Sequence, residues 1–320
     1  MTKVALACTV ISNATRKIRG AILWPWQDRM TIGIGALATS DEGRKNKLTP
    51  DTAILIADTM GSYEDIDSHA RLHKILMFPE DRVYAAAAGD VTLAAEMIPG
   101  ICSLLREIPR GERTYGKIQQ ALANGCFEYK SHKFTLFELP RHRLAPHAFN
   151  PNQKLDADLD VKIQAAWSEF NVGCDALVVV FDDMGTAFLF ELLGQEHTIF
   201  TRNFPGFAAI GTGSGNALFW LARRQHTLGL LPLRAAYHAY EAKLTAEGSA
   251  HVNEHIDILV ATANEHWFCT THKSLHGEKE HPEINLLSLQ RLLKKYWVKK
   301  TDDIGVVIKP LPSRKSAGRL

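Results

Sequence analysis

The chain has 320 residues, of which 46% are hydrophobic and 22% are charged, and its formal net charge at pH 7 is +2. This composition is typical of a globular protein and argues against a disordered chain, and so small a charge gives no reason to expect a nucleic acid or an anionic surface as partner. No stretch approaches the roughly 18–20 consecutive apolar residues that a membrane-spanning helix needs, so no membrane contact is expected either.

The cysteines are odd in number and widely spaced, at Cys8, Cys102, Cys126, Cys174 and Cys269. None belongs to a Cys-x-x-Cys pair, so we expect neither a disulfide framework nor a structural zinc site. This use of cysteine favours a reducing, cytoplasmic environment and a protein without metal or cofactor.

Residues 1–30 stand apart from the rest of the chain. They carry basic residues between short apolar runs, which is a poor secretory signal because a continuous apolar segment and a cleavage site are missing. Three interpretations remain open: an ordinary N-terminal segment, a propeptide, or upstream sequence from a wrongly assigned start codon. Met30 directly before Thr31 favours the third, because removal of an initiator Met would expose the amine of Thr31.

In chain order, residues 31–37 and 52–58 predict two buried strands of a hairpin, joined by a charged loop over residues 41–50. Residues 83–88 predict a strand that ends at Gly89. Asp90 is the expected N-cap of a helix that reaches residue 104 or 105, with a kink or an interruption at Pro99.

The second half repeats this alternation after a helix at 115–129 and an expected irregular insertion over about 130–160. The elements predicted there are a helix at 161–170, strands at 176–181, 186–192 and 207–210, helices at 216–224 and 233–246, and a strand at 256–261. This order predicts an α+β fold, a four-layer α-β-β-α sandwich of two antiparallel sheets between helical layers. Residues 270–320 form a C-terminal extension with one late amphipathic helix.

Four polar or small residues stand in a particular order along the first three predicted strands. Thr31 opens the first strand, Asp58 ends the second, Lys74 follows after 16 positions, and Gly89 closes an alanine-rich strand. This order resembles the proteasome β-type family of N-terminal nucleophile hydrolases, bacterial relatives included, which places its Asp and Lys 16 positions apart. The resemblance covers about residues 31–124 and 174–263 and implies a single hydrolase domain over residues 31–269.

The resemblance implies a threonine-type peptidase. A threonine at the chain start brings its own base, because its α-amine, with an ordinary pKa near ~8, lies beside the hydroxyl. An ammonium nearby lowers that pKa further. By resemblance Thr31 is the nucleophile, Lys74 is the ammonium, Asp58 is its counter-ion, and the N–H of Gly89 stabilises the oxyanion.

A second segment also resembles the family. Thr212 and Ser214, in the glycine-rich run 211–215, correspond to hydroxyls that approach the threonine amine. Where the family often adds an Asp and, three residues on, a Ser, this chain has Ser249 and Val252, so that carboxylate is missing. Two alternatives therefore stay open: an inactive proteasome-fold scaffold subunit, or an N-terminal nucleophile amidase for a small molecule, with the insertion shaping its pocket.

The resemblance further implies peptide or unfolded-protein substrates and self-assembly into rings, while the chain gives no sign of an ATPase partner. If Leu72, Leu76, Ala87 and Val91 line the first substrate pocket, apolar side chains are preferred there. Taken singly, each site residue also has an ordinary explanation: a strand-forming Thr, a turn-starting Asp and a solvated Lys. Only their combination favours the hydrolase.

Three other motifs give weaker evidence of function. The run Gly211-x-Gly213-x-Gly215 lacks the last glycine of a dinucleotide-binding fingerprint, because residue 216 is Asn. The histidine pairs 251/255 and 272/276 have helical spacing without a third ligand, which favours surface histidines over a metal site. The basic run 294–300 is more typical of a solvated helix face than of a nucleic-acid or membrane contact.

Overall fold

A computed structural model describes residues 32–45, 49–58, 73–109, 111–142, 157–194, 198–248, 252 and 256–270. All structural statements below concern these residues. The predictions made for Thr31, Leu72, Ser249, the histidine pairs 251/255 and 272/276, the segment 1–30 and the extension beyond residue 270 lie outside them.

The first sheet has five antiparallel strands in the order β10-β9-β2-β1-β8. Their bounds are β1 (Ile32–Ala38), β2 (Thr52–Ala57), β8 (Phe207–Gly211), β9 (Asp257–Ala261) and β10 (His266–Thr270). The predicted β1–β2 hairpin is confirmed, with Gly33 opposite Ala57. The absence of a side chain at Gly35 lets this sheet approach its neighbour, because a Cβ there would lie 2.9 Å from the side chain of Leu189.

The second sheet is also antiparallel and five-stranded, in the order β3-β4-β5-β6-β7. Its strands are β3 (Ile75–Phe78), β4 (Val83–Gly89), β5 (Cys174–Phe181), β6 (Ala187–Leu192) and β7 (Ile199–Thr201). The predicted β5–β6 hairpin is confirmed. Its turn is closed by Asp182, whose Oδ1 accepts hydrogen bonds from the backbone N–H groups of Met184 and Thr186.

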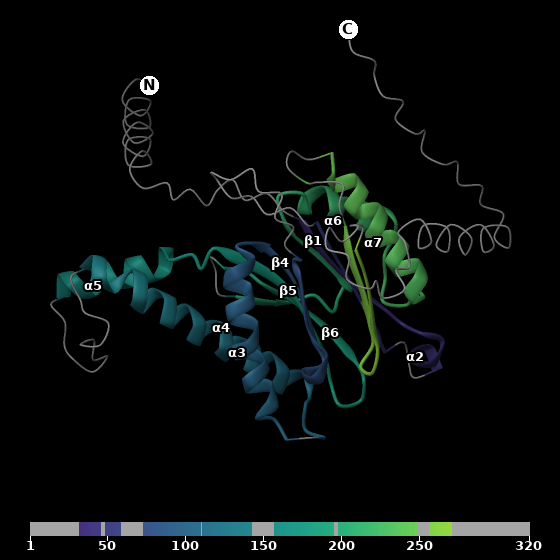
Figure 1. Ribbon diagram of the computed structural model, residues 1–320, viewed down its shortest axis with the longest axis horizontal. Coiled ribbons are helices and arrows are strands. Elements are labelled where there is room, and N and C mark those ends of the chain that lie inside the picture. The colour runs from purple at the N-terminus through teal and green to yellow at the C-terminus, as the bar shows by residue number, and fades with distance from the viewer. Residues whose placement is uncertain are drawn as a thin grey trace, which may run out of the picture.

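Residues of two helix pairs share buried clusters with the two sheets. Residues of α3 (Val91–Arg106) and α4 (Tyr115–Phe137) share a buried cluster with the second sheet. Residues of α6 (Ser214–Arg223) and α7 (Pro232–Ala246) share another with the first sheet. A third cluster joins residues of both sheets, and the two helix pairs lie on different sides of the strands (Figure 1). The fold is therefore mixed α+β, built on two antiparallel sheets.

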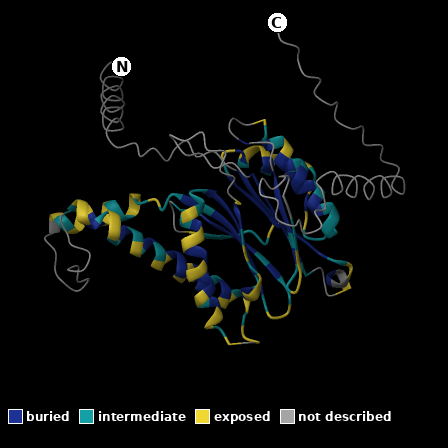
Figure 2. Ribbon diagram, in the orientation of Figure 1, coloured by how far each residue is buried: buried dark blue, intermediate teal, exposed yellow. Residues whose placement is uncertain are grey.

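The sequence prediction of an irregular insertion over residues 130–160 is wrong at both of its ends, while its middle, residues 143–156, lies outside the described residues. Helix α4 continues to Phe137, a 3-10 turn follows at Leu139–His142, and α5 (Ala157–Glu169) begins before residue 161. Residues 130–142 are ordered because Phe134, Leu139 and Ile163 bury one another in a small cluster of their own. Together α4 and α5 form an arm, here called the α4–α5 arm, whose far end extends away from the sheets and shows many exposed residues (Figure 2).

Smaller differences concern local elements. A short helix α2 (Asp41–Lys45) lies in the expected loop 41–50. Asp90 caps α3 as predicted, since its Oδ1 accepts from the N–H of Thr92 at 3.0 Å, but Pro99 lies inside α3 and does not interrupt it. Strands β3, β7 and β10 were not predicted. Among the described helices none is both long and apolar enough to cross a membrane.

Candidate functional site

The candidate site is built around a buried ion pair. Lys74 Nζ donates a hydrogen bond to Asp58 Oδ1 over 2.7 Å, and the two side chains are 1% and 0% exposed. Asp58 lies directly after β2, and Lys74 directly before β3, so the pair joins the first sheet to the second. The structure therefore places Asp58 and Lys74, which lie 16 positions apart in the sequence, in direct contact.

The same carboxylate is held by the first described residue of β1. The N–H of Ile32 donates to Asp58 Oδ1 over 3.2 Å, while the N–H of Asp58 donates to the carbonyl oxygen of Ile32, also over 3.2 Å. Asp58 therefore extends the hydrogen-bond ladder between β1 and β2 by one step. In this step its carboxylate accepts the hydrogen bond that a backbone carbonyl oxygen would otherwise accept. Because Ile32 directly follows Thr31 in the sequence, the ion pair lies next to the position at which the nucleophile was predicted.

The glycine-rich segment also reaches the start of β1. Ile32 lies opposite Gly211, the last residue of β8. The turn that follows contains Thr212 and leads into Ser214, the first residue of α6. A Cβ on the intervening Gly213 would lie 3.1 Å from the side chain of Val252 and 3.3 Å from that of Ile32. The segment that carries Thr212 and Ser214, and the predicted site position 252, therefore converge on the beginning of β1.

Gly89 ends β4 in a conformation that favours glycine. Its φ is +82°, and a Cβ there would lie 2.6 Å from the carbonyl oxygen of Gly173. The strand also contacts the ion pair, because the N–H of Ala87 donates to the carbonyl oxygen of Lys74 over 2.9 Å. Gly89 therefore lies two residues after Ala87, the residue that bonds to Lys74. At this point β4 ends and the chain continues through Asp90 into α3.

Of the four predicted substrate-pocket residues, three lie close together, and Leu72 lies outside the described residues. Ala87 is fully buried, and Leu76 and Val91 pack against the same cluster under α3 and α4. They therefore contribute to the core between α3, α4 and the second sheet.

Burial dominates the electrostatics of the ion pair. It raises the pKa of Asp58, against the attraction of Lys74, and it lowers the pKa of Lys74, against the attraction of Asp58. A second ammonium, that of the fully buried Lys243 on α7, also lowers the pKa of Asp58 and is itself bonded to Glu247. Lys74 consequently gives up its proton more readily than an exposed lysine.

Sequence reasoning missed two residues of this site, Asp257 and His73. Asp257 opens β9 opposite Ala57, and its side chain is fully buried. His73 Nδ1 donates to Asp257 Oδ2 over 3.0 Å, and the charge of Asp257 raises the pKa of Lys74. The signal that points to Asp257 is a lone carboxylate at the start of an otherwise apolar strand, and His73 directly precedes Lys74.

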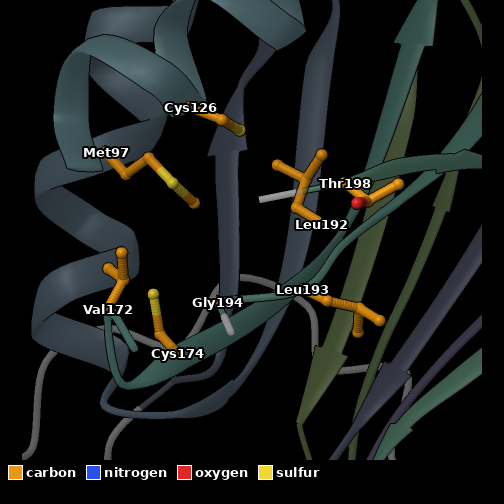
Figure 3. Close-up of a pocket in the computed structure, with 8 residues that line it drawn as sticks. All are labelled: Met97, Cys126, Val172, Cys174, Leu192, Leu193, Gly194 and Thr198. Atoms are coloured by element: carbon orange, nitrogen blue, oxygen red, sulfur yellow. The ribbon is translucent and has the colours of Figure 1, made fainter. Parts of the chain in front are cut away.

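A pocket lies elsewhere, between α3, α4 and the second sheet (Figure 3). It is lined by Met97, Cys126, Val172, Cys174, Leu192, Leu193, Gly194 and Thr198. Its volume of about 20 Å³ holds roughly one water molecule. Burial raises the pKa of the Cys126 thiol to about 12, and that of Cys174 as well, so neither thiol is reactive. We assign this pocket no part in binding a substrate.

No group of three or more His, Cys, Asp or Glu side chains in the described ranges is arranged to hold a metal ion. The chain matches no protein-family model, and a search of the curated proteins finds no match.

Proposed function

We propose that this protein is a threonine-type peptidase of the proteasome β type, which hydrolyses peptide bonds through Thr31 after removal of residues 1–30. One observation carries the proposal: the buried Lys74–Asp58 pair is hydrogen-bonded to the amide of Ile32. Thr31 directly precedes Ile32 in the sequence, which supports the choice of Thr31 as the proposed nucleophile.

In this mechanism the α-amine of Thr31 takes the proton of its own hydroxyl, and Oγ attacks the carbonyl carbon of the substrate. The bond between Oγ and that carbon forms, the C–N bond of the peptide breaks, and the leaving amine takes the proton. Water then hydrolyses the resulting ester and restores the hydroxyl. The Lys74 ammonium keeps the amine neutral by repulsion, and Asp58 orients Lys74 through the contact at 2.7 Å.

The oxyanion of the tetrahedral intermediate is assigned to the N–H of Gly89. A preorganised backbone donor of this kind contributes on the order of 3 kcal/mol. The positive φ of Gly89 supports the assignment, because it gives the end of β4 a backbone direction that other residues rarely adopt. Thr212 and Ser214 are proposed to contact the amine, since their segment lies against Ile32.

The proposal also covers the layer arrangement of the fold, the substrates and the assembly. Two helix pairs that cover different sheets, with a shared cluster between the sheets, support a four-layer α-β-β-α sandwich. Peptides or unfolded chains are the proposed substrates, and self-assembly into rings is proposed by resemblance to the family.

The deciding experiment determines the N-terminal residue of the purified chain and then measures its peptide hydrolysis. Intact mass and N-terminal sequencing of the purified chain establish whether it begins at Thr31. A chain that begins there is then compared with Thr31→Ala and Thr31→Ser on a fluorogenic peptide library. We expect Thr31→Ala to lose on the order of a thousand-fold or more in kcat/KM and Thr31→Ser to keep measurable turnover. Retained hydrolysis by Thr31→Ala overturns the proposal.

A second candidate, an inactive scaffold subunit, is favoured by one observation. Val252, which stands where the family has a serine, is only 8% exposed and offers no hydroxyl. A chain that retains residues 1–30, hydrolyses no peptide and still forms rings would support the scaffold.

A further inference from the structure

Asp257 and His73 form a second charged pair beside the Lys74–Asp58 pair. The carboxylate of Asp257 is fully buried at the start of β9, and the imidazole of His73, two residues before β3, is 59% exposed. Their contact is 3.0 Å between Nδ1 and Oδ2. The ring of Phe268, on β10, packs edge-on against His73 at 5.7 Å and helps to fix its orientation.

The position of Asp257 relative to Asp58 is set by the first sheet. Asp257 lies opposite Ala57, the residue before Asp58 on the neighbouring strand. Along β9, Ile256 and Ile258 face the helices and Leu259 faces the second sheet, so Asp257 is placed on the side of the second sheet. The carboxylates of Asp58 and Asp257 therefore lie on either side of the end of β2, and the negative charge of each raises the pKa of Lys74.

We propose that Asp257, held by His73, is a second positioning carboxylate of the Lys74 site, and that the protonation of His73 couples this site to pH. The kinetic part of this inference rests on the proposed peptidase function. Asp257 Oδ1 has no hydrogen-bond partner among the described residues. A buried carboxylate in this state is stabilised by the positive charges around it, which here are His73 when protonated and Lys74.

The direction of the coupling follows from these charges. While His73 is protonated, its charge offsets that of Asp257, and Lys74 is held mainly by Asp58. When His73 loses its proton, the charge of Asp257 acts on Lys74 alone, and the ammonium is retained more firmly. The hydrogen bond to Asp257 raises the pKa of His73 above its usual 6.5, so the change falls above pH 6.5. Lys243, bonded to Glu247, is the further charge that acts on Asp58 from α7.

The test measures the titration of Lys74 directly. Lysine residues are labelled with 13C at Cε in the full chain, and the Lys74 resonance is assigned by its loss in Lys74→Met. In Asp257→Asn we expect the pKa of Lys74 to fall by roughly one unit. Glu265→Gln is the matched control, because it removes a charge from the exposed far turn of the same β9–β10 hairpin and should leave Lys74 unchanged.

A second variant keeps the inference testable if Asp257→Asn does not fold. His73→Gln changes a half-exposed residue, and it should remove the step in the Lys74 resonance that accompanies His73 titration. If Asp257→Asn and Glu265→Gln give the same Lys74 titration, or if His73→Gln keeps the step, the inference is wrong.

The kinetic readout is separate. Where peptide hydrolysis is present, Asp257→Asn should shift the pH profile of kcat by roughly one unit to lower pH, with little change in KM. An unshifted profile contradicts the positioning role. A wild-type chain without hydrolysis refutes the proposed function, while the lysine titration still decides whether Asp257 acts on Lys74.

Discussion

Asp58 and Ile32 exchange two hydrogen bonds of 3.2 Å each, one through the backbone of Asp58 and one through its carboxylate. The carboxylate is therefore part of the sheet, as fixed in position as a ladder carbonyl. Since Lys74 Nζ binds the same Oδ1, the ammonium is fixed relative to the start of β1. This coupling of a charge to a strand end is the observation on which the proposed function depends.

The first prediction concerns Lys74→Met. This change leaves Asp58 buried without its partner, which costs about 3–5 kcal/mol in the free energy of unfolding, and it removes the charge that lowers the amine pKa. We expect hydrolysis to fall to near background and the chemical denaturation midpoint to drop.

The double variant Asp58→Asn with Lys74→Met is the control for that experiment, because it leaves no uncompensated charge. It should recover part of the lost stability while remaining inactive. Recovery of activity in the double variant would refute the role of Lys74.

A second prediction separates the oxyanion role of Gly89 from a general effect of glycine. In Gly89→Ala the new Cβ meets the carbonyl oxygen of Gly173 at 2.6 Å, and the φ of +82° is unfavourable for alanine by about 1–2 kcal/mol. We therefore expect lower stability and a fall in kcat that exceeds any change in KM.

Gly100→Ala is the matched comparison, because Gly100 lies inside α3 and, apart from its chain neighbours and the backbone of its own helix, no atom lies within 4 Å of the added Cβ. It should be neutral or stabilising by up to about 1 kcal/mol. Equal effects of the two substitutions on kcat would contradict the assignment of Gly89.

How much the sequence predicts can be judged from these same residues. Asp58 and Gly89 follow or close predicted apolar strands, and the resemblance, with its 16-residue spacing from Asp58 to Lys74, predicted that the two charged residues act together. Asp257 was missed because its contact depends on the β2–β9 pairing, which no local pattern specifies. Strands β3, β7 and β10 were missed because runs of 3 to 5 residues show too little periodicity.

The α4–α5 arm was missed for a different reason. Lys130 interrupts the apolar stripe of α4, and nearby prolines suggested a loop. In the structure the side chain of Lys130 is 1% exposed, its Nζ donates to the carbonyl oxygen of Trp167 at 2.7 Å, and it lies 4.2 Å from the centre of that ring. An aromatic partner on α5 thus makes a lysine into a core residue, which periodicity alone does not reveal.

The third prediction concerns acid stability. Burial lowers the pKa of His226 to about 4 and that of His238 to about 3, from an ordinary 6.5. The folded protein therefore keeps both rings neutral while the unfolded chain takes up protons, so stability is present above pH 6.5 and is lost as the pH falls from 6.5 toward 4. For His226 alone the loss is on the order of 3 kcal/mol.

Urea denaturation between pH 4 and pH 7.5 measures this loss. His226→Gln removes the titration and keeps a donor for the carbonyl oxygen of Leu37, which lies 3.2 Å from His226 Nε2. The variant should show a shallower fall of stability with acid than the wild type. His132→Gln, an exposed position on α4, is the control, and an equal slope in all three chains would refute the prediction.

The last prediction concerns the α4–α5 arm and the small-molecule amidase hypothesis. Phe134 is 5% exposed and packs edge-on against Trp167 at 5.1 Å and Phe170 at 5.5 Å. Phe134→Ala should cost about 3–5 kcal/mol locally, and hydrogen exchange of α5 amides should accelerate. Phe137→Ala, with a side chain that is 53% exposed on the same helix, should change neither quantity.

Because Phe134 belongs to the small cluster of the α4–α5 arm, loosening α5 should leave kcat/KM for peptides unchanged. A parallel fall in turnover of small amides, with peptides unaffected, would instead place the arm at the substrate pocket and favour the amidase. Unchanged turnover of both substrates, together with faster exchange in α5, would show that the arm is independent of the Lys74 site.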